Sequence, residues 1–327
     1  MTGISFVDQA SLLRYHQTML ADRERVDCYR DALREIVRPG DFVVDLGSGT
    51  GLLAFLACQA GAARVYAIER GPILRIAREL AEANGFQDRI VFVEADSSRA
   101  TLPEQAGVLI SETLWNFGLG EGMVATIADA RERFLEPGGR VMPASFEMVA
   151  APFEDEAVYG RLALDPPDRD GLDFSLLRAY ARNNVHVPAP LRADGLLSAP
   201  AVVQEFDLTA DGPPEARGAL SFTIERAGTV HGLAGWFSAR LSPSVTLANP
   251  PGVEASSWRQ AFLPFKNATD VRSGDVIDAT VQTAAGGTVW HWTAELRSDG
   301  SSAEGTLVAD QTTFFGFPLA LEVAGLD

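Results

Sequence analysis

The chain has 327 residues, 46% of them hydrophobic and 22% charged, which is enough to bury a large core in one big domain or two ordinary ones. Its formal net charge of -17 argues against nucleic acid as a partner, because phosphate binding rests on clustered lysine and arginine. No apolar run approaches the ~20 residues of a membrane-spanning helix and no export signal opens the chain, so we expect no membrane contact and a cytoplasmic location. The two cysteines, Cys28 and Cys58, form no metal-binding motif, and we expect packed thiols and no metal site.

The first 143 residues predict a helical segment followed by an α/β domain. Residues 11–37 contain no glycine or proline and repeat apolar residues at helical spacing, so residues 1–40 are expected to be helical. From residue 41 to 143, short β-rich runs alternate with helix-like stretches such as residues 71–85. This alternation is typical of a doubly wound parallel sheet, that is, a Rossmann-like domain.

The pattern changes to all-β over residues 144–327. Short strand candidates separated by Pro/Gly/Asp-rich turns predict a β-barrel-like or sandwich domain. These candidates are residues 145–153, 201–209, 219–228, 275–284 and 288–297. Residues 171–187 look helical instead, and we expect them to form a projecting arm at about residues 160–198.

A glycine-rich turn, VVDLGSGTG at residues 43–51, predicts a nucleotide-like ligand, because glycines allow close backbone approach and the next helix begins with free N–H groups. The glycine order differs from the dehydrogenase G-x-G-x-x-G, and Asp45 suits the cationic amino group of a methionine moiety better than a diphosphate. Glu69 ends the second strand, where it can accept hydrogen bonds from ribose hydroxyls, and Asp96 ends the third, beside an adenine edge. The pattern predicts S-adenosylmethionine bound to a class I methyltransferase fold, with these residues in contact: Asp45, Gly47, Ser48, Gly49, Gly51, Glu69, Asp96 and Ser97.

The chain resembles the protein arginine methyltransferases along nearly its whole length. Residues 15–33 resemble the helix that covers the cofactor in that family, and residues 43–51 with 67–69 match its cofactor motifs. Residues 111–123 are similar to the double-glutamate loop, and residues 256–265 resemble the Thr-His-Trp loop of its barrel domain. Residues 171–187 fall where the family carries its dimerisation arm, which implies a homodimer.

The resemblance also implies individual roles. His16 and Met19 would touch the cofactor, and Arg25 would pair with its carboxylate. Glu112 and Glu121, nine positions apart, would be the catalytic pair, because two carboxylates can hold a planar guanidinium and bias its charge away from the attacking nitrogen. On the acceptor side we expect these residues: Phe6, Trp115, Met123, Ser257 and Trp258.

Two departures from the family bear on the acceptor. Ser257 stands where the family has histidine, although Asp22 keeps the position of its acidic partner, and Phe6 and Ala10 stand where tyrosines would. These changes favour a small amino-acid-like acceptor, which is an amine, a guanidine or a thioether such as methionine. The alternatives are a protein arginine N-methyltransferase and a non-catalytic scaffold that binds the cofactor; a nicotinamide oxidoreductase is excluded by the glycine order.

Overall fold

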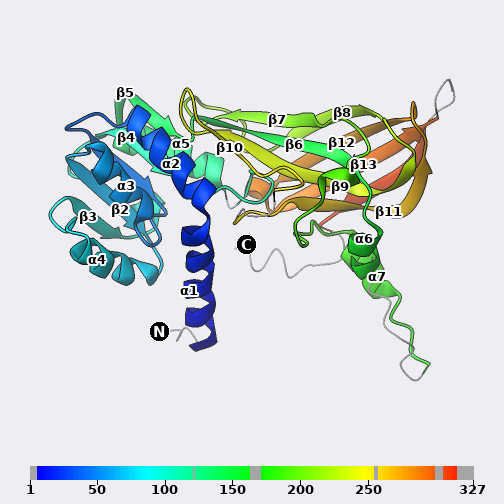
Figure 1. The fold of residues 1–327 in the computed structure, drawn as a ribbon, viewed down its shortest axis with the longest axis horizontal. Coiled ribbons are helices and arrows are strands. Elements are labelled where there is room, and N and C mark those ends of the chain that lie inside the picture. The colour runs from blue at the N-terminus through cyan, green and yellow to red at the C-terminus, as the bar shows by residue number, and fades with distance from the viewer. Residues whose placement is uncertain (1–5, 121, 163–170, 254–256, 299–304, 315–327) are drawn as a thin grey trace.

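The N-terminal segment of the computed structural model forms two helices where the sequence predicted one continuous helical run. The structure describes residues 6–120, 122–162, 171–253, 257–298 and 305–314. Helix α1, Phe6–Ala21, projects away from the body, and α2, Arg23–Ile36, packs against the α/β unit (Figure 1). The chain breaks at Asp22, whose carboxylate accepts a hydrogen bond from Arg25 N at 3.0 Å. The expected single helix was wrong here because an aspartate at an N-cap stabilises a helix start.

A parallel sheet with strand order β3-β2-β1-β4-β5 follows. Its strands are β1 Phe42–Leu46, β2 Arg64–Glu69, β3 Ile90–Glu94, β4 Ala106–Ser111 and β5 Leu135–Met142. Helices α3 Leu52–Ala60, α4 Ile73–Ala83 and α5 Met123–Phe134, with the short turn η1 Ser97–Arg99, connect them. Strand order reverses between β1 and β4, and the crevice at the carboxyl ends of such strands is where open α/β sheets bind ligands.

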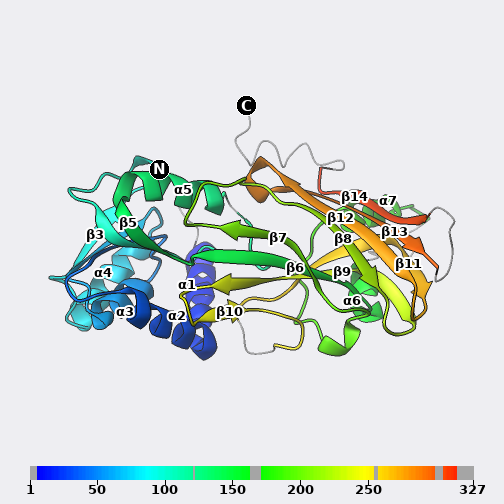
Figure 2. The ribbon, with the colours of Figure 1, turned by 90° about the horizontal axis from the view of Figure 1, so that it is seen from above.

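Two antiparallel sheets make up the second unit, with orders β10-β9-β6-β7, to which β11 adds beside β9, and β14-β13-β12-β8 (Figure 2). Their strands are β6 Ser145–Phe153, β7 Ala201–Asp207, β8 Arg217–Thr223, β9 Gly228–Arg240, β10 Thr246–Ala248, β11 Ala261–Val271, β12 Val276–Ala284, β13 Val289–Arg297 and β14 Thr306–Thr312. Short turns η2 Ala193–Gly195 and η3 Ala285–Gly287 also occur. Edge strand β7 lies beside β8, and β11 lies beside β14, so the two sheets approach each other along both edges.

The strand candidate at residues 219–228 was wrong at its C-terminal end, because β8 stops at Thr223. Strand β9 was missed altogether. Its middle is buried on both faces, so it lacks the alternation that marks a half-buried strand.

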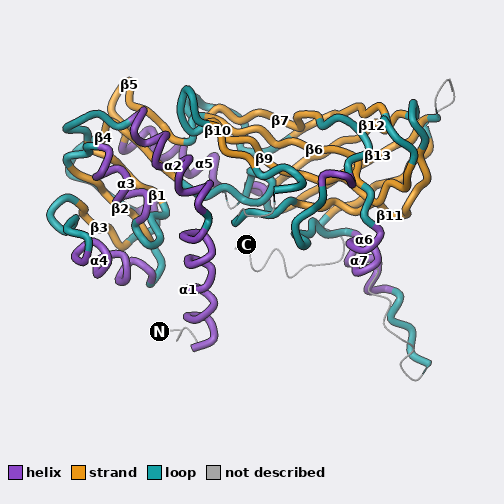
Figure 3. Tube along the Cα trace, in the orientation of Figure 1, coloured by secondary structure: helices purple, strands orange, loops and turns teal. Residues whose placement is uncertain are grey.

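Helices α6, Glu156–Leu162, and α7, Leu176–Arg182, form the described part of the arm, which projects to the same side as α1 (Figure 3). The helix predicted over residues 171–187 is therefore shorter than expected. The Asn183 side chain donates to Ala179 O at 2.8 Å, which satisfies a carbonyl at the helix end and favours termination there. Residues 163–170 of the expected arm lie outside the described residues.

One buried apolar cluster runs through both units. It contains Val43 of β1, Phe117 of the loop after β4 and Trp290 of β13. The loop between the parallel sheet and α5 is therefore packed between the two units. Among the helices that the structure describes, none is both long and apolar enough to cross a membrane.

Candidate active site

A cavity of about 550 Å³ lies at the carboxyl ends of β1, β2 and β4, a size typical of small-molecule sites. Of the residues predicted from the sequence, its wall includes His16, Met19, Arg25, Asp45, Gly47, Ser48, Gly49, Glu69, Asp96, Ser97, Glu112, Trp115 and Met123. Gly51, Ser257 and Trp258 are not part of this wall. Glu121 and the side chain of Phe6 lie outside the described part of the chain.

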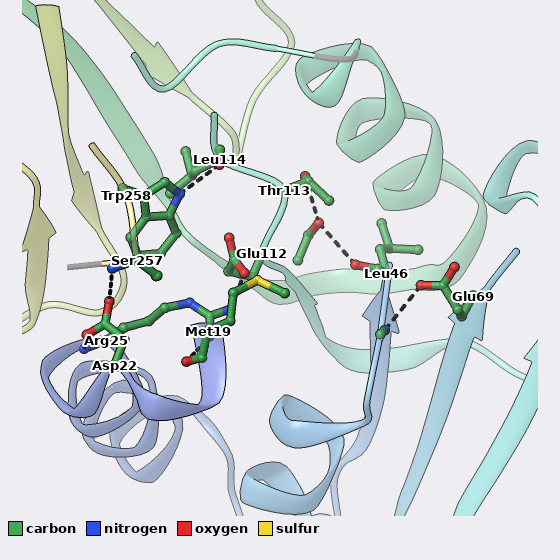
Figure 4. Close-up of polar contacts among 12 residues, drawn as sticks. Met19, Asp22, Arg25, Leu46, Glu69, Glu112, Thr113, Leu114, Ser257 and Trp258 are labelled. Atoms are coloured by element: carbon green, nitrogen blue, oxygen red, sulfur yellow. Dashed lines mark hydrogen bonds and ion pairs between the residues drawn. The ribbon is translucent and has the colours of Figure 1, made fainter. Parts of the chain in front are cut away.

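The glycine turn is shaped so that backbone, and not side chain, faces the cavity. Gly47 and Gly49 have φ of +71° and +53°, which favours glycine. A Cβ at Gly49 would lie only 3.1 Å from the His16 ring. Glu69, at the end of strand β2, accepts a hydrogen bond from Gly49 N at 3.1 Å (Figure 4). It also accepts one from Gly71 N at 2.6 Å. A carboxylate has further lone pairs, so Glu69 can accept hydrogen bonds from a ligand as well.

Gly51 and Asp96 have structural roles in the backbone beside the cavity. Gly51 has φ of +84° at the start of α3, and a Cβ there would lie 3.0 Å from the Phe55 ring, so glycine is required by the backbone. Asp96 lies two residues beyond the end of β3, and its carboxylate accepts Ser98 N at 3.1 Å as the cap of η1.

Three polar atoms in the cavity wall are buried and have no hydrogen-bond partner among the described residues. They are Asp45 Oδ2, Ser48 Oγ and Arg25 Nε. Burial raises the pKa of Asp45 to about 8. The hydrogen bond from the backbone N–H of Ala54 lowers this pKa, whereas the negative charge of Glu69 raises it further. Buried polar groups without partners are costly, so this wall is built for a polar ligand with a cationic group near Asp45.

Glu112 forms an ion pair with Arg25, and both side chains are nearly buried (Figure 4). Arg25 also donates to Met19 O at 3.1 Å, and its guanidinium carbon lies 5.8 Å and 5.3 Å from the ring centres of Tyr29 and Trp258. Burial raises the pKa of Glu112, while the positive charge of Arg25 opposes that rise. Glu112 therefore already binds one guanidinium in this structure.

Contacts from the antiparallel unit hold residues 112–120 and 122, which we call the acidic loop. Trp258 Nε1 donates to Leu114 O at 3.0 Å, and Arg259 N donates to Asn116 Oδ1 at 2.8 Å. Asn249 Nδ2 donates to Asn116 O at 2.9 Å. Sequence reasoning missed both asparagines, because a single amide carries no recognisable pattern.

Ser257 contacts Asp22 through its backbone. Its N–H donates to Asp22 Oδ2 at 2.5 Å, whereas its buried hydroxyl has no partner among the described residues. Asp22 thereby joins the start of α2 to the 257–259 segment. A serine hydroxyl is no substitute for an imidazole base. The histidine–aspartate pair of the family, which the sequence predicted to be broken at Ser257, is therefore replaced by a structural contact.

The doubly wound sheet, the glycine turn at its switch point and the cavity above it define a class I methyltransferase, whose cofactor is S-adenosylmethionine. Residues 28–142 match the family described as Ribosomal protein L11 methyltransferase (PrmA), and residues 146–290 match the Arginine methyltransferase oligomerization subdomain.

Known proteins place the chain within this class. Protein arginine N-methyltransferase 6 of Xenopus laevis is 30% identical over 261 residues, covering 76% of this chain and 77% of that protein. Arginine N(omega)-methyltransferase of Streptomyces achromogenes subsp. streptozoticus is 32% identical over 272 residues, covering 81% of this chain and 74% of that protein. The chain belongs to the protein arginine methyltransferase family, as the sequence resemblance predicted.

Solved structures show the same fold. A heterotetrameric complex of the Trypanosoma brucei PRMT1 enzyme and prozyme with AdoHcy aligns with a TM-score of 0.78 at 24% identity, covering 91% of this chain and 97% of that one. Arabidopsis thaliana protein arginine methyltransferase 10 aligns with a TM-score of 0.79 at 22% identity, covering 92% and 99%. These structures confirm the predicted class I fold, and membership of the methyltransferase family confirms S-adenosylmethionine as the cofactor.

Proposed function

We propose that the protein transfers the methyl group of S-adenosylmethionine to a guanidinium nitrogen of a small, arginine-like acceptor held by Glu112 and Glu121. The observation that carries the proposal is the nearly buried Glu112 carboxylate in the cavity wall, which binds a guanidinium, that of Arg25. A carboxylate placed this way favours a planar cation with forked donors over a neutral acceptor.

We assign the cofactor to the glycine-turn side of the cavity. Asp45 Oδ2, which has no hydrogen-bond partner among the described residues, suits its amino group. Arg25, whose Nε also has no partner in that part of the chain, can turn from Glu112 to the cofactor carboxylate. Glu69 would take the ribose hydroxyls. The remaining assigned contacts are His16, Met19, Gly47, Ser48, Gly49, Asp96 and Ser97.

When bound, the cofactor supplies a methyl group attached to a sulfonium sulfur. The electron pair of the C–S bond stays on sulfur when the methyl group is transferred. Once Arg25 engages the cofactor carboxylate, Glu112 is free to hold the acceptor guanidinium and to orient one of its nitrogens toward that methyl group. Glu112 also stabilises the positive charge of the methylated product until the nitrogen releases its proton to solvent water. Orientation and this negative charge are the contributions of the protein.

The small size of the acceptor is inferred from Ser257 and from one relative. With a backbone contact in place of the histidine pair, the 257–259 segment offers no imidazole to a peptide arginine. The Streptomyces relative is named for arginine N(omega)-methylation, which supports a guanidine over an amine or a thioether. A protein arginine acceptor is the second candidate, supported by the name of the Xenopus relative.

Free arginine is expected to be methylated with a kcat/KM at least about tenfold above that of an arginine-rich peptide, because the site would be shaped for the smaller ligand. Transfer from cofactor labelled in its methyl group measures both, with citrulline as the uncharged control and methionine as the thioether. Label on peptide arginine alone would reject the small acceptor in favour of the second candidate.

Asp45 is expected to make cofactor binding release a proton below about pH 8. The pKa of Asp45 is about 8 in the folded protein, against an ordinary 3.8, and a cationic amino group beside it favours the ionised form. The same shift contributes stability at low pH that is lost as pH rises through about 8. Titration calorimetry at pH 7 in buffers of different ionisation enthalpy measures the proton count, and the Asp45→Asn variant should show none. An unchanged proton count in that variant would assign the release to another group.

A homodimer is also expected, because the arm exposes apolar side chains. Leu172 and Leu176 are 63% and 64% exposed, and the matched subdomain is named for oligomerization. Burying such residues in a second copy would remove apolar surface from water. Light scattering should give a dimer for the wild type and a monomer for Leu172→Asp/Leu176→Asp; a wild-type monomer would contradict the proposal.

A further inference from the structure

We propose that η3 and Trp290, in the β12–β13 hairpin of the antiparallel unit, are positioning residues for the acidic loop, and that they fix Trp115 as the wall of the acceptor site. The inference deepens the proposed function, since it rests on an acceptor that lies beside Glu112. It assigns a role in acceptor binding to residues about 175 positions from that glutamate in the sequence.

The backbone of η3 touches the backbone of the acidic loop with no side chain between them. Gly122 N donates to Gly286 O at 3.1 Å. A Cβ at Gly287, where φ is +89°, would lie 3.2 Å from the Leu119 side chain and 3.6 Å from Gly120 Cα. Two glycines in the turn therefore permit an approach that larger residues would push apart.

Trp290 contacts the middle of the same loop. Its ring stacks on Phe117 at 5.5 Å with an interplanar angle of 13°, and lies 5.8 Å from the ring of Trp115. Its Nε1 donates to Gly287 O at 2.8 Å, so η3 also orients the indole. Trp290 is 4% exposed, which leaves it little freedom to move.

Trp115 both contacts Trp290 and lines the cavity. Trp115 and Gly118 exchange backbone hydrogen bonds of 3.1 Å and 2.7 Å, which makes a tight turn. Trp115 lines the cavity three residues after Glu112, and an indole face attracts a guanidinium. The cofactor side of the cavity is built by β1 and β2 instead, so displacement of Trp115 should weaken acceptor binding and spare cofactor binding.

Trp290→Leu tests the proposal, with Trp292→Leu as its matched control. Trp292 lies two residues further along β13, is fully buried, and donates its Nε1 to Pro264 O at 3.0 Å, so its loss removes a similar tryptophan without touching η3. Measured quantities are the KM for the acceptor, kcat, the Kd of the demethylated cofactor and the melting temperature. Trp290→Leu is expected to raise the acceptor KM about tenfold or more, with the cofactor Kd within about twofold and the acceptor KM of Trp292→Leu within about threefold.

Equal changes in acceptor KM for the two tryptophan variants, or an unchanged KM in folded Trp290→Leu, would overturn the proposal. If Trp290→Leu does not fold, Gly287→Ala provides the test, because its new Cβ would press on the Leu119 side chain at 3.2 Å without removing a core side chain. Its control is Gly40→Ala, which has a similar φ of +93° and open space around the Cβ. Gly287→Ala should raise the acceptor KM about fivefold relative to Gly40→Ala, and equal values would overturn the proposal.

The wild-type acceptor preference and the KM of the variants test the two proposals separately. The wild type alone shows whether the acceptor is small or a peptide. The KM of the variants is then compared using whichever acceptor the wild type methylates. A peptide acceptor would reject the proposed small acceptor, and the positioning role of Trp290 would be tested with that peptide.

Discussion

Glu112→Gln is expected to lower kcat by about 10²–10³-fold while the cofactor Kd stays within about threefold. Glutamine keeps the size of the side chain, but it carries no charge to attract a guanidinium or to stabilise the positive charge of the product. Arg25 remains available to the cofactor in this variant, so binding of the demethylated cofactor should survive. Radiolabel transfer gives kcat, and calorimetry gives the Kd.

Glu104→Gln is the matched control for this experiment. Glu104 also pairs with an arginine, Arg64, at 3.0 Å, but it lies outside the cavity wall. Its replacement should leave kcat unchanged. If Glu112→Gln retained wild-type kcat, or if both variants lost activity equally, Glu112 would not be the acceptor-binding carboxylate.

Arg25→Met is expected to lower the free energy of unfolding by about 3 kcal/mol, because it leaves the nearly buried Glu112 charge without a partner. The cofactor Kd should rise at least about a hundredfold, since the proposed partner of its carboxylate is lost. Denaturant unfolding and calorimetry measure the two effects. The matched control is Arg226→Met, whose partner Glu154 is partly exposed, and which should cost under about 1 kcal/mol.

The pH dependence of Arg25→Met follows from the same charge. Burial already raises the pKa of Glu112, and losing Arg25 removes the group that opposes the rise. A raised folded pKa contributes stability at low pH that disappears as pH rises, so the variant should be more destabilised at pH 8 than at pH 5. Arg25→Met/Glu112→Gln should regain part of the stability and none of the activity. Equal destabilisation at both pH values would show that lost packing, and not the unpaired charge, causes the effect.

Local sequence patterns predicted the parts of the fold whose signals are local. Strands β1 to β4 are short β-rich runs between helix-like stretches, and the glycine turn after Asp45 is a contiguous motif. Strand β5 gave no such signal, because Pro137, Gly138 and Gly139 interrupt its β-pattern. Strand β9 is buried on both faces and so resembles no alternating strand.

The contacts that organise the site are long-range, and no local pattern encodes them. The ion pair of Arg25 with Glu112 joins residues 87 positions apart, and the bond from Asn249 to Asn116 O spans 133. The resemblance indicated that Arg25 and Glu112 belong to the site, but it assigned Arg25 to the cofactor alone. The break at Asp22 was hidden because the helical pattern continues across it, and only the cap reveals it.

We expect the glycine turn to hold the cofactor with its methyl group facing Glu112. A crystal structure with the demethylated cofactor and free arginine would show this arrangement. We expect the cofactor sulfur to face the acceptor guanidinium on Glu112, with Arg25 turned to the cofactor carboxylate. A cofactor bound elsewhere, or an arginine bound away from Glu112 while Arg25 stays paired with that glutamate, would show that the proposed site is wrong.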